Sequence, residues 1–254
     1  MNIPSAQLNL NAWRTPPATL RIRPGEIHIW RINLELPEAE INLWESLLSA
    51  DECARANRFI FKKHRDAYIA ARGALRQTLG LYLQADPSAL RFTYATHGKP
   101  SLAAEHKAQD LRFNVSYSAG VALLALAVAM EVGIDIERVH DDFPYQEIAL
   151  RFFAPAEYAL FCAAEAARRC EIFFKYWTYK EAFIKAIGLG LSYPLNQFEV
   201  SLHPGVPVQV LSTPDPAPGH SLHFIAPGAD YIGALAVMGI CTDILLWAGG
   251  SNSA

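Results

Sequence analysis

The sequence predicts an α+β fold of two similar lobes, each made of helices and a small antiparallel sheet, with the active site between them. With 254 residues and 52% hydrophobic content, the chain is long enough for one large domain or two small lobes. Each half combines helical periodicity with short alternating segments. The tetrapeptide ALAV also recurs in an apolar strand of each half, at 125–128 and 234–237. This repeat favours two related lobes that meet near residue 130.

We therefore expect an N-terminal lobe over residues 1–129 and a C-terminal lobe over residues 130–254 that carries the acidic motifs described below. Within the first lobe, the proline-containing segment 1–25 is expected to be a lead-in that precedes the first strand. The sequence assigns no role to the proline-rich loop over 204–218.

The elements of the first half follow from periodicity and from capping residues. Ser49 and Glu52 have the spacing of a capping box, so a helix is expected to begin there. Tyr68, Leu75 and Leu79 recur at helical spacing within the clearest long helix. The predicted strands are 26–34, 90–94, 111–116 and 121–130, and the predicted helices are 38–48, one from 49 onward, and 62–83.

The second half is expected to contain two helices and three strands. Pro155 lies where a first-turn proline is tolerated, which predicts a helix over 156–169. The segment 171–187 is apolar on most sides, so it should be a deeply packed helix, ended by Gly188 and Gly190. The predicted strands are 198–202, 221–225 and 231–238.

Composition limits the classes of partner and the compartment. The net charge of −3 gives no overall attraction to nucleic acid or to an anionic membrane, so any anion site must be local. The four cysteines form no C-x-x-C pair, which argues against a zinc site and favours a reduced compartment. The N-terminus lacks a signal-peptide pattern, and no apolar run reaches the roughly 18 residues of a membrane span. We expect a cytoplasmic protein.

The motif GIDIER, at 133–138, directly follows an apolar strand. Strand alternation places Asp135 and Glu137 on the same face, opposite Ile134 and Ile136. Two carboxylates at the end of a strand that enters a core need a compensating cation, and Mg²⁺ bound together with a phosphate is one candidate. Taken alone, the pattern is more typical of a solvated strand end.

A second motif, WTYKEAFIK at 177–185, lies in the expected helix 171–187. Helical spacing places Glu181 and Lys185 on one face, as in many surface ion pairs that contribute only a few tenths of a kcal/mol. Because the rest of this helix is apolar, we expect the pair to enter a cleft instead. Asp135, Glu137 and Glu181 would then supply three acidic ligands, with Lys185 available for a phosphate oxygen.

These two motifs and four shorter segments together resemble the Sfp-type 4′-phosphopantetheinyl transferases. The resemblance covers about residues 55–194, in the order of the family. The four shorter segments are GKP at 98–100, FNVSYS at 113–118, RFF at 151–153 followed by Glu157, and GLGLSYP at 188–194.

The resemblance implies a pseudo-dimer of two α+β lobes with coenzyme A in the cleft between them. It implies transfer of the phosphopantetheine arm of coenzyme A to a serine hydroxyl of an acyl or peptidyl carrier protein, with release of adenosine 3′,5′-bisphosphate. Such carriers serve fatty acid, polyketide and non-ribosomal peptide biosynthesis, and the sequence does not choose among them. The implied metal is Mg²⁺, or Mn²⁺ in its place, and the expected assembly state is a monomer.

The resemblance also assigns roles to the two acidic motifs. Asp135, Glu137 and Glu181 would be metal ligands, and Asp135, Glu181 and Lys185 would be the catalytic residues. Lys185 would contact the pyrophosphate and stabilise the leaving bisphosphate. Glu181 is the candidate general base toward the carrier serine, directly or through a water, and this role competes with metal ligation.

Coenzyme A contacts are implied along most of the matching stretch. Lys99 and Pro100 would lie at the nucleotide end, although a lysine in such a turn is often simply solvated. Ser116 would donate its hydroxyl to a phosphate oxygen. Arginines on the helical stretch would meet the 3′-phosphate, although the first two also suit solvated helix faces. The full predicted set is Arg55, Arg58, Arg72, Lys99, Pro100, Ser116, Tyr117, Asp135, Glu181 and Lys185.

One position departs from the family pattern. Tyr117 stands where the family has histidine, and a phenol can donate one hydrogen bond to phosphate but cannot carry an imidazolium charge. We expect a weaker or shifted phosphate contact there. No surface for the carrier protein is assigned from the sequence. The alternative functions are a non-catalytic module that binds coenzyme A or a carrier protein, and a Mg²⁺-dependent nuclease, which would need a basic track.

Overall fold

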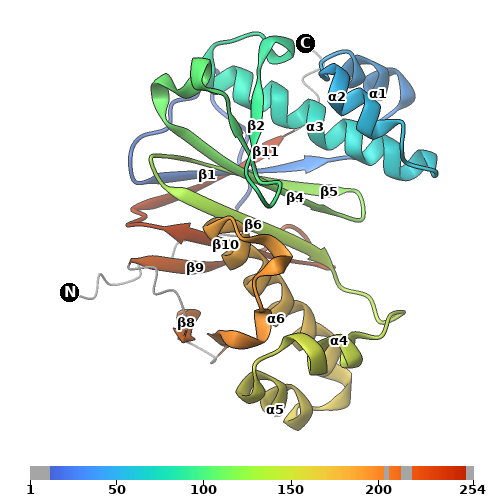
Figure 1. The fold of residues 1–254 in the computed structure, drawn as a ribbon, viewed down its shortest axis with the longest axis vertical. Helices are drawn as coiled ribbons and strands as arrows, with labels where there is room; N and C mark the ends of the chain where they lie inside the picture. The colour runs from blue at the N-terminus through green and yellow to red at the C-terminus, as the bar shows by residue number, and fades with distance from the viewer. Residues whose placement is uncertain (1–11, 203–205, 213–218, 250–254) are drawn as a thin grey trace.

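The fold, a computed structural model, stacks two sheets face to face between two layers of helices (Figure 1). The structure describes residues 12–202, 206–212 and 219–249. The start of the expected lead-in and much of the proline-rich loop therefore lie outside the described residues. This mixed architecture, in which nearly all paired strands are antiparallel, confirms the predicted α+β class.

The first sheet has the strand order β11-β1-β5-β4, and helices α1, α2 and α3 cover its outer face (Figure 1). Its strands are β1 (Glu26–Asn33), β4 (Leu111–Ser118), β5 (Val121–Val128) and β11 (Asp243–Gly249). The helices are α1 (Glu38–Glu45), α2 (Ala50–Ala56) and α3 (Lys62–Leu83). The expected capping box begins α2, where the Ser49 amide donates to the Glu52 carboxylate at 3.0 Å.

The second sheet has the order β6-β10-β9, with α6 against its outer face. Its strands are β6 (Glu131–Arg138), β9 (His220–Ile225) and β10 (Tyr231–Met238). The helices are α4 (Tyr145–Phe152), α5 (Pro155–Ala163) and α6 (Ala166–Ile187). Two small hairpins pair β2 (Phe92–Tyr94) with β3 (Pro100–Leu102) and β7 (Glu199–Ser201) with β8 (Gln209–Ser212). Short 3₁₀ turns span Pro87–Ala89, Ala104–Gln109, Gly190–Ser192 and Leu195–Gln197.

The two sheets share a plan, because β1-β5-β4 and β6-β10-β9 have the same strand order with one 22-residue helix on each outer face. The ALAV tetrapeptides lie in the corresponding central strands, β5 and β10. Their side chains, however, point in opposite senses. Ala125 and Ala127 face the apolar layer between the sheets, whereas Ala234 and Ala236 face α6. The repeat therefore marks matching strands without matching side-chain positions.

Some element boundaries differ from the prediction. The helix expected over 156–169 ends at Ala163, and residues 166–169 instead begin α6. The break consists of two residues, Ala164 and Glu165, with no glycine or proline to signal it. Strands β8 and β11 and helix α4 were not predicted. By contrast, the long helix over 62–83 is confirmed at both ends, and Gly188 ends α6 in the left-handed conformation.

The division of the chain into lobes between residues 129 and 130 stays a prediction. One strand from the second half of the chain belongs to the first sheet. β11, at the end of the described chain, pairs in parallel with β1 of the first sheet. The backbone of Arg14 in the lead-in also bonds to β11, through Leu246 and Ala248. Among the described residues, no helix is both long and apolar enough to cross a membrane.

Helix α6 lies directly against the backbone of β6 at Gly133. A β-carbon built on Gly133 would overlap the Ala182 carbonyl oxygen and the Ala186 amide nitrogen, and would lie 2.9 Å from the Ala186 Cα. The residue paired with Gly133 in the neighbouring strand is Ala236, which also faces α6. Only glycine permits this approach, so the position of α6 depends on a missing side chain.

A buried ion pair holds the other side of α6. Lys180 and Glu157 are essentially inaccessible to solvent, with Nζ and Oε2 2.8 Å apart. The Lys180 ammonium also donates to the carbonyls of Leu195 and Phe198, at 2.7 and 2.6 Å. Glu157 accepts from the backbone amides of Ala154 and Val200. The pair thus joins α5, α6 and the chain entering β7 with its hydrogen bonds satisfied.

We predict that Gly133→Ala lowers the free energy of unfolding by about 3 kcal/mol, because the new methyl group must push α6 off β6. Urea denaturation measures the change. Gly228→Ala is the matched control, since a β-carbon there meets only Tyr231 at an ordinary 3.6 Å. Equal, small effects of the two substitutions would contradict the close approach.

We predict that Lys180→Met lowers the free energy of unfolding by about 3–5 kcal/mol, because it leaves the Glu157 charge buried and unpaired. The double variant Lys180→Met, Glu157→Leu should recover much of that loss. Lys175→Met on the same helix is the control, since its pair with Glu171 is partly exposed and contributes at most about 1 kcal/mol. Losses that add fully in the double variant would show that the pair is not coupled.

Candidate functional site

The site lies along the seam where β4 of the first sheet meets β6 of the second. Side chains at alternate β4 positions bridge the seam. The Asn114 side-chain oxygen accepts from the Ile134 amide at 2.8 Å, and the Ser116 hydroxyl donates to Asp135 Oδ1 at 2.7 Å. The Ser118 hydroxyl lies 3.0 Å from Glu137 Oε2. The FNVSYS segment therefore joins the lobes by presenting a polar group at every second residue.

Helix α6 adds an acid and a cation to this seam. The Lys185 ammonium lies 2.6 Å from Asp135 Oδ1 and 2.9 Å from the Ser116 hydroxyl. Glu181, one turn earlier on the same face, is buried beside them. The structure thus brings together Ser116, Asp135, Glu181 and Lys185 in one partly buried place, with Glu137 two residues along β6.

The carboxylates of the seam perturb one another. Burial raises the pKa of Glu181 to about 7, and the charges of Asp135 and Glu137 add to that rise while Lys185 opposes it. Burial and the Asp135 charge raise the pKa of Glu137 to about 6, against hydrogen bonds from Ser118 and Trp177. Acids with pKa values this close to neutrality can both hold and release a proton, as a general base must.

The donor set is suited to a divalent cation. Two buried carboxylate oxygens, Asp135 Oδ2 and Glu181 Oε1, have no hydrogen-bond partner in the described part of the chain. An unpaired buried oxygen is costly, and Mg²⁺ favours carboxylate oxygens in this setting. Within the described ranges, however, no three acidic, histidine or cysteine side chains are close enough to ligate an ion as they stand. As the side chains stand, an ion would therefore have one or two of these carboxylates as ligands and would take its other ligands from phosphate or water.

Lys99 lies in the turn between β2 and β3, and it is not a simple solvated lysine. Its ammonium pairs with Glu131 at 2.7 Å and donates to the carbonyls of Val132 and Ala186, each at 3.2 Å. The Ala186 carbonyl belongs to the last turn of α6, where a cation is favourable. Beside Lys99, a cavity of about 710 Å³ is lined by Pro100, Phe113, Met238 and their neighbours.

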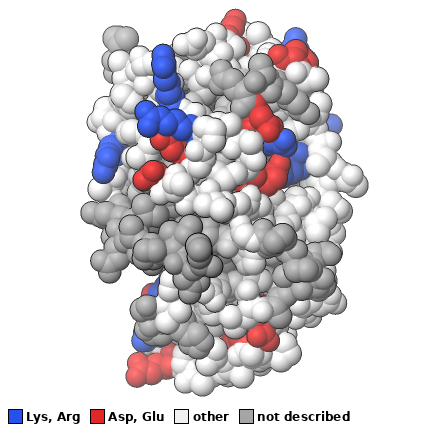
Figure 2. All heavy atoms as spheres, turned by 90° about the vertical axis from the view of Figure 1, so that its left-hand side faces the viewer, with Lys and Arg blue, Asp and Glu red and all other residues white. Residues whose placement is uncertain are grey.

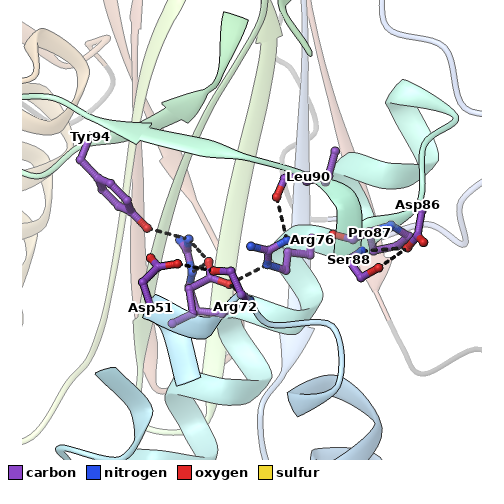
Figure 3. A network of polar contacts seen from close by, with 10 residues as sticks. Asp51, Arg72, Arg76, Asp86, Pro87, Ser88, Leu90 and Tyr94 are labelled. Atoms are coloured by element: carbon purple, nitrogen blue, oxygen red, sulfur yellow. Dashed lines mark hydrogen bonds and ion pairs between the residues drawn. The ribbon is translucent and has the colours of Figure 1, made fainter. Parts of the chain in front are cut away.

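The three arginines expected near the 3′-phosphate differ in their surroundings. Arg55 and Arg58 are exposed on and just after α2. Arg72 is buried in α3, where its guanidinium pairs with Glu52 and lies 3.3 Å from the Tyr94 hydroxyl (Figure 3). Arg72 therefore already has a protein anion as its partner, and its predicted contact with the 3′-phosphate stays a prediction.

Arg76 completes this network from the next turn of α3. Its Nε donates to the second Glu52 oxygen at 2.6 Å, and its Nη1 donates to the Leu90 carbonyl at 3.1 Å (Figure 3). Burial raises the pKa of Glu52, but the two guanidinium groups outweigh it and hold the pKa below its usual value. Glu52 was predicted only as a capping residue. Its role as a shared counter-ion needed the tertiary contact between α2 and α3.

Tyr117 points away from the carboxylates. Alternation along β4 places it opposite Ser116 and Ser118, and its ring is partly exposed. Burial raises its pKa, and the nearby positive charges of Arg55 and Arg72 oppose that rise. The phenol therefore lies toward the arginines of the first lobe. Glu131, Asn114 and Ser118 were not predicted as part of the site, although the last two lie inside the FNVSYS segment.

Comparison with known proteins bears on the whole chain. The family profile described as 4′-phosphopantetheinyl transferase, N-terminal, matches residues 36–129, and that of the 4′-phosphopantetheinyl transferase superfamily matches residues 131–236. The 4′-phosphopantetheinyl transferase HetI of Nostoc sp. is 37% identical over 237 residues, which is 93% of this chain and 98% of HetI. Sfp of Bacillus subtilis is 32% identical, over 66% of this chain and 72% of Sfp.

Among solved structures, a holo-[acyl-carrier-protein] synthase of Thermotoga maritima overlaps 43% of this chain and 62% of its own, at 27% identity and a TM-score of 0.36. This overlap is partial, so the assignment depends on the two family profiles and on HetI, whose match covers 93% of this chain. With HetI aligned from end to end, the chain belongs to the 4′-phosphopantetheinyl transferase superfamily.

Proposed function

We propose that this enzyme transfers the 4′-phosphopantetheine arm of coenzyme A to a serine hydroxyl of an apo carrier protein. The observation that carries the proposal is the seam itself. It places a lysine, a serine hydroxyl and three carboxylates, two of them with raised pKa values, between two lobes, in a chain of this superfamily. Released adenosine 3′,5′-bisphosphate is the second product.

The residues of the seam divide the chemistry between them. The serine oxygen forms a bond to the phosphorus that bears the pantetheine arm, and the bond from that phosphorus to the bridging oxygen breaks. Glu181, with a pKa near 7, accepts the serine proton. Lys185 and Ser116 donate to phosphate oxygens, and the lysine charge stabilises the leaving bisphosphate.

Asp135, Glu137 and Glu181 are the residues that would hold Mg²⁺. Asp135 and Glu181 each have a buried oxygen without a partner, and the raised pKa values of Glu137 and Glu181 indicate that negative charge there lacks compensation, which a divalent cation would supply. Once bound, the ion supplies positive charge that offsets the negative charge growing on the pyrophosphate. Mn²⁺ has similar ligand preferences and would serve in the same place. Lys185, now paired with Asp135, would then be freed to reach the phosphates.

The remaining coenzyme A contacts are proposed along the first lobe. The cavity beside Lys99 and Pro100 would accept the nucleotide end, with Lys99 contributing local positive charge. Arg55, Arg58 and Tyr117 lie on the side of β4 where a 3′-phosphate would be met. Arg72 would add positive charge near the 3′-phosphate while it stays paired with Glu52.

The proposed partners are acyl and peptidyl carrier proteins, and the proposed assembly state is a monomer. A cytoplasmic location is favoured by the four cysteines, all of which are described and free. The nuclease alternative would need a continuous basic track. On the face shown in Figure 2, lysines and arginines are instead mixed with acidic side chains. Elsewhere in the contacts of the chain, Arg112 pairs with Asp110 and Glu131.

We predict that an apo acyl or peptidyl carrier protein gains one phosphopantetheine mass when incubated with this protein, coenzyme A and Mg²⁺. Intact-protein mass spectrometry measures the gain. Asp135→Ala and EDTA should each abolish it, because both remove the proposed metal site. Asp142→Ala, in an exposed acid, should leave it unchanged. Coenzyme A binding without transfer to either carrier would favour the non-catalytic alternative.

We also predict that Mg²⁺ stabilises the protein more at pH 8 than at pH 5.5. The raised pKa values mean that the folded protein retains protons on Glu137 and Glu181 that the unfolded chain releases near pH 4.5. Without metal, the free energy of unfolding should therefore fall as the pH rises from about 4.5 to 7. Mg²⁺ competes with those protons, so its effect on Tm should grow over the same interval.

Thermal unfolding with and without Mg²⁺ at a series of pH values measures this effect. Glu181→Gln has no proton to release at this position, so it should remove much of the pH dependence. A Tm increase on adding Mg²⁺ that is the same at pH 5.5 and pH 8 would exclude these carboxylates as ligands.

A further inference from the structure

The loop between α2 and α3 exposes two adjacent apolar side chains. Ile60 is 92% exposed and Phe61 is 67% exposed, and no other large apolar side chain among the described residues is as accessible as Ile60. We name these two residues the apolar tip. The next residue back, Phe59, is instead partly buried and packs against Tyr68, so the loop is anchored just before the tip. An anchored loop with exposed apolar residues is typical of an interaction surface.

Positive charge surrounds the apolar tip on both sides. Arg58 precedes it, and Lys62 and Lys63 follow it. Lys62 is paired with Asp66 at 2.6 Å. Within the described part of the chain, neither Arg58 nor Lys63 forms an ion pair, and both are exposed. The loop thus presents apolar surface with uncompensated cations, although the whole chain has a net charge of −3.

The tip also lies at the same edge of the molecule as the seam. The start of α3, the turn between β4 and β5, and the end of β6 all lie at the right-hand edge of Figure 1. Contacts agree with this placement. Ser118, beside that turn, bonds Glu137 near the end of β6, while Tyr117 lies toward Arg55 of α2. A partner that contacts the tip is therefore at the same edge of the molecule as Glu137, the carboxylate nearest the end of β6.

We propose that the apolar tip and its flanking cations dock the carrier protein, by contacting a surface that combines apolar and acidic side chains beside its serine. The proposal rests on the proposed function, which requires a protein partner at this edge. Charge complementarity selects an acidic face. Two exposed side chains provide little area for membrane insertion, and the net negative charge of the chain opposes binding to an anionic bilayer.

The experiment compares Ile60→Ser and Phe61→Ser with Ile240→Ser. Ile240 is as accessible as Phe61, at 67%, but it follows Met238, which pairs with Glu131 at the opposite end of β6. The two tip variants should raise the KM for apo acyl carrier protein about tenfold. Their KM for coenzyme A and their kcat should match those of the wild type, because neither residue contacts the seam. Ile240→Ser should behave as the wild type throughout.

Charge is tested separately with Lys63→Glu. This variant should also raise the KM for the carrier protein. Added salt should raise the carrier KM less in the variant than in the wild type, because the variant has lost one of the attractive charges that salt screens. Binding of fluorescently labelled apo acyl carrier protein, measured without coenzyme A, gives a second readout that does not depend on transfer.

The outcomes are distinguishable. Normal transfer with an unchanged carrier KM in all three variants overturns the docking proposal and leaves the proposed function intact. If the variants bind the carrier protein more weakly than the wild type does, but the wild type transfers no phosphopantetheine, the docking proposal is supported and the proposed function is overturned. The variants and the wild type are also tested for binding to phosphatidylglycerol–phosphatidylcholine vesicles. If the wild type binds the vesicles, the variants do not, and the carrier KM is unchanged, the docking proposal is overturned and the tip is assigned to a membrane surface.

Discussion

The site depends on how closely α6 approaches β6. Helix and sheet surfaces normally keep side chains between them, but at Gly133 the helix backbone rests on the strand backbone itself. The neighbouring strand contributes Ala234 and Ala236 to the same face, so small residues surround the point of closest approach. In the first sheet the corresponding face carries Leu124 and Leu126 beneath α3. Two lobes of one plan therefore differ in the depth at which the helix sits.

That depth determines the electrostatics. Because α6 lies low on β6, Glu181 and Lys185 enter the same partly buried volume as Asp135. Three carboxylates and one ammonium in such a place leave unbalanced negative charge, which the fold tolerates by protonation. The surrounding framework uses charges that have close partners. Lys180 pairs with Glu157, and Glu52 is shared by Arg72 and Arg76, which leaves that network with one positive charge. The raised pKa values are found at the seam, on Glu137 and Glu181.

Local sequence predicted the elements that have strong local signals. The helix over 62–83, the capping box at Ser49 and the end of α6 at Gly188 each follow from nearby residues, and the two acidic motifs meet as helix and strand periodicity suggested. The helix boundary that failed has no local signal, since Ala164 lies in a break without glycine or proline. Nothing in the sequence signals two distant contacts either: Arg72 pairs with Glu52, twenty positions away, and Lys99 reaches the end of α6. Neither contact has a periodic signature along the chain, and the predicted coenzyme A roles of these two residues stay predictions.

The return of the last strand has a consequence for synthesis. Because β11 covers the outer edge of β1, the first sheet lacks its fourth strand until the segment that forms the whole second sheet has been synthesised. An open strand edge of that kind is prone to pair with other chains. Synthesis of β11, Asp243–Gly249, therefore closes an edge at which the nascent protein could misassemble.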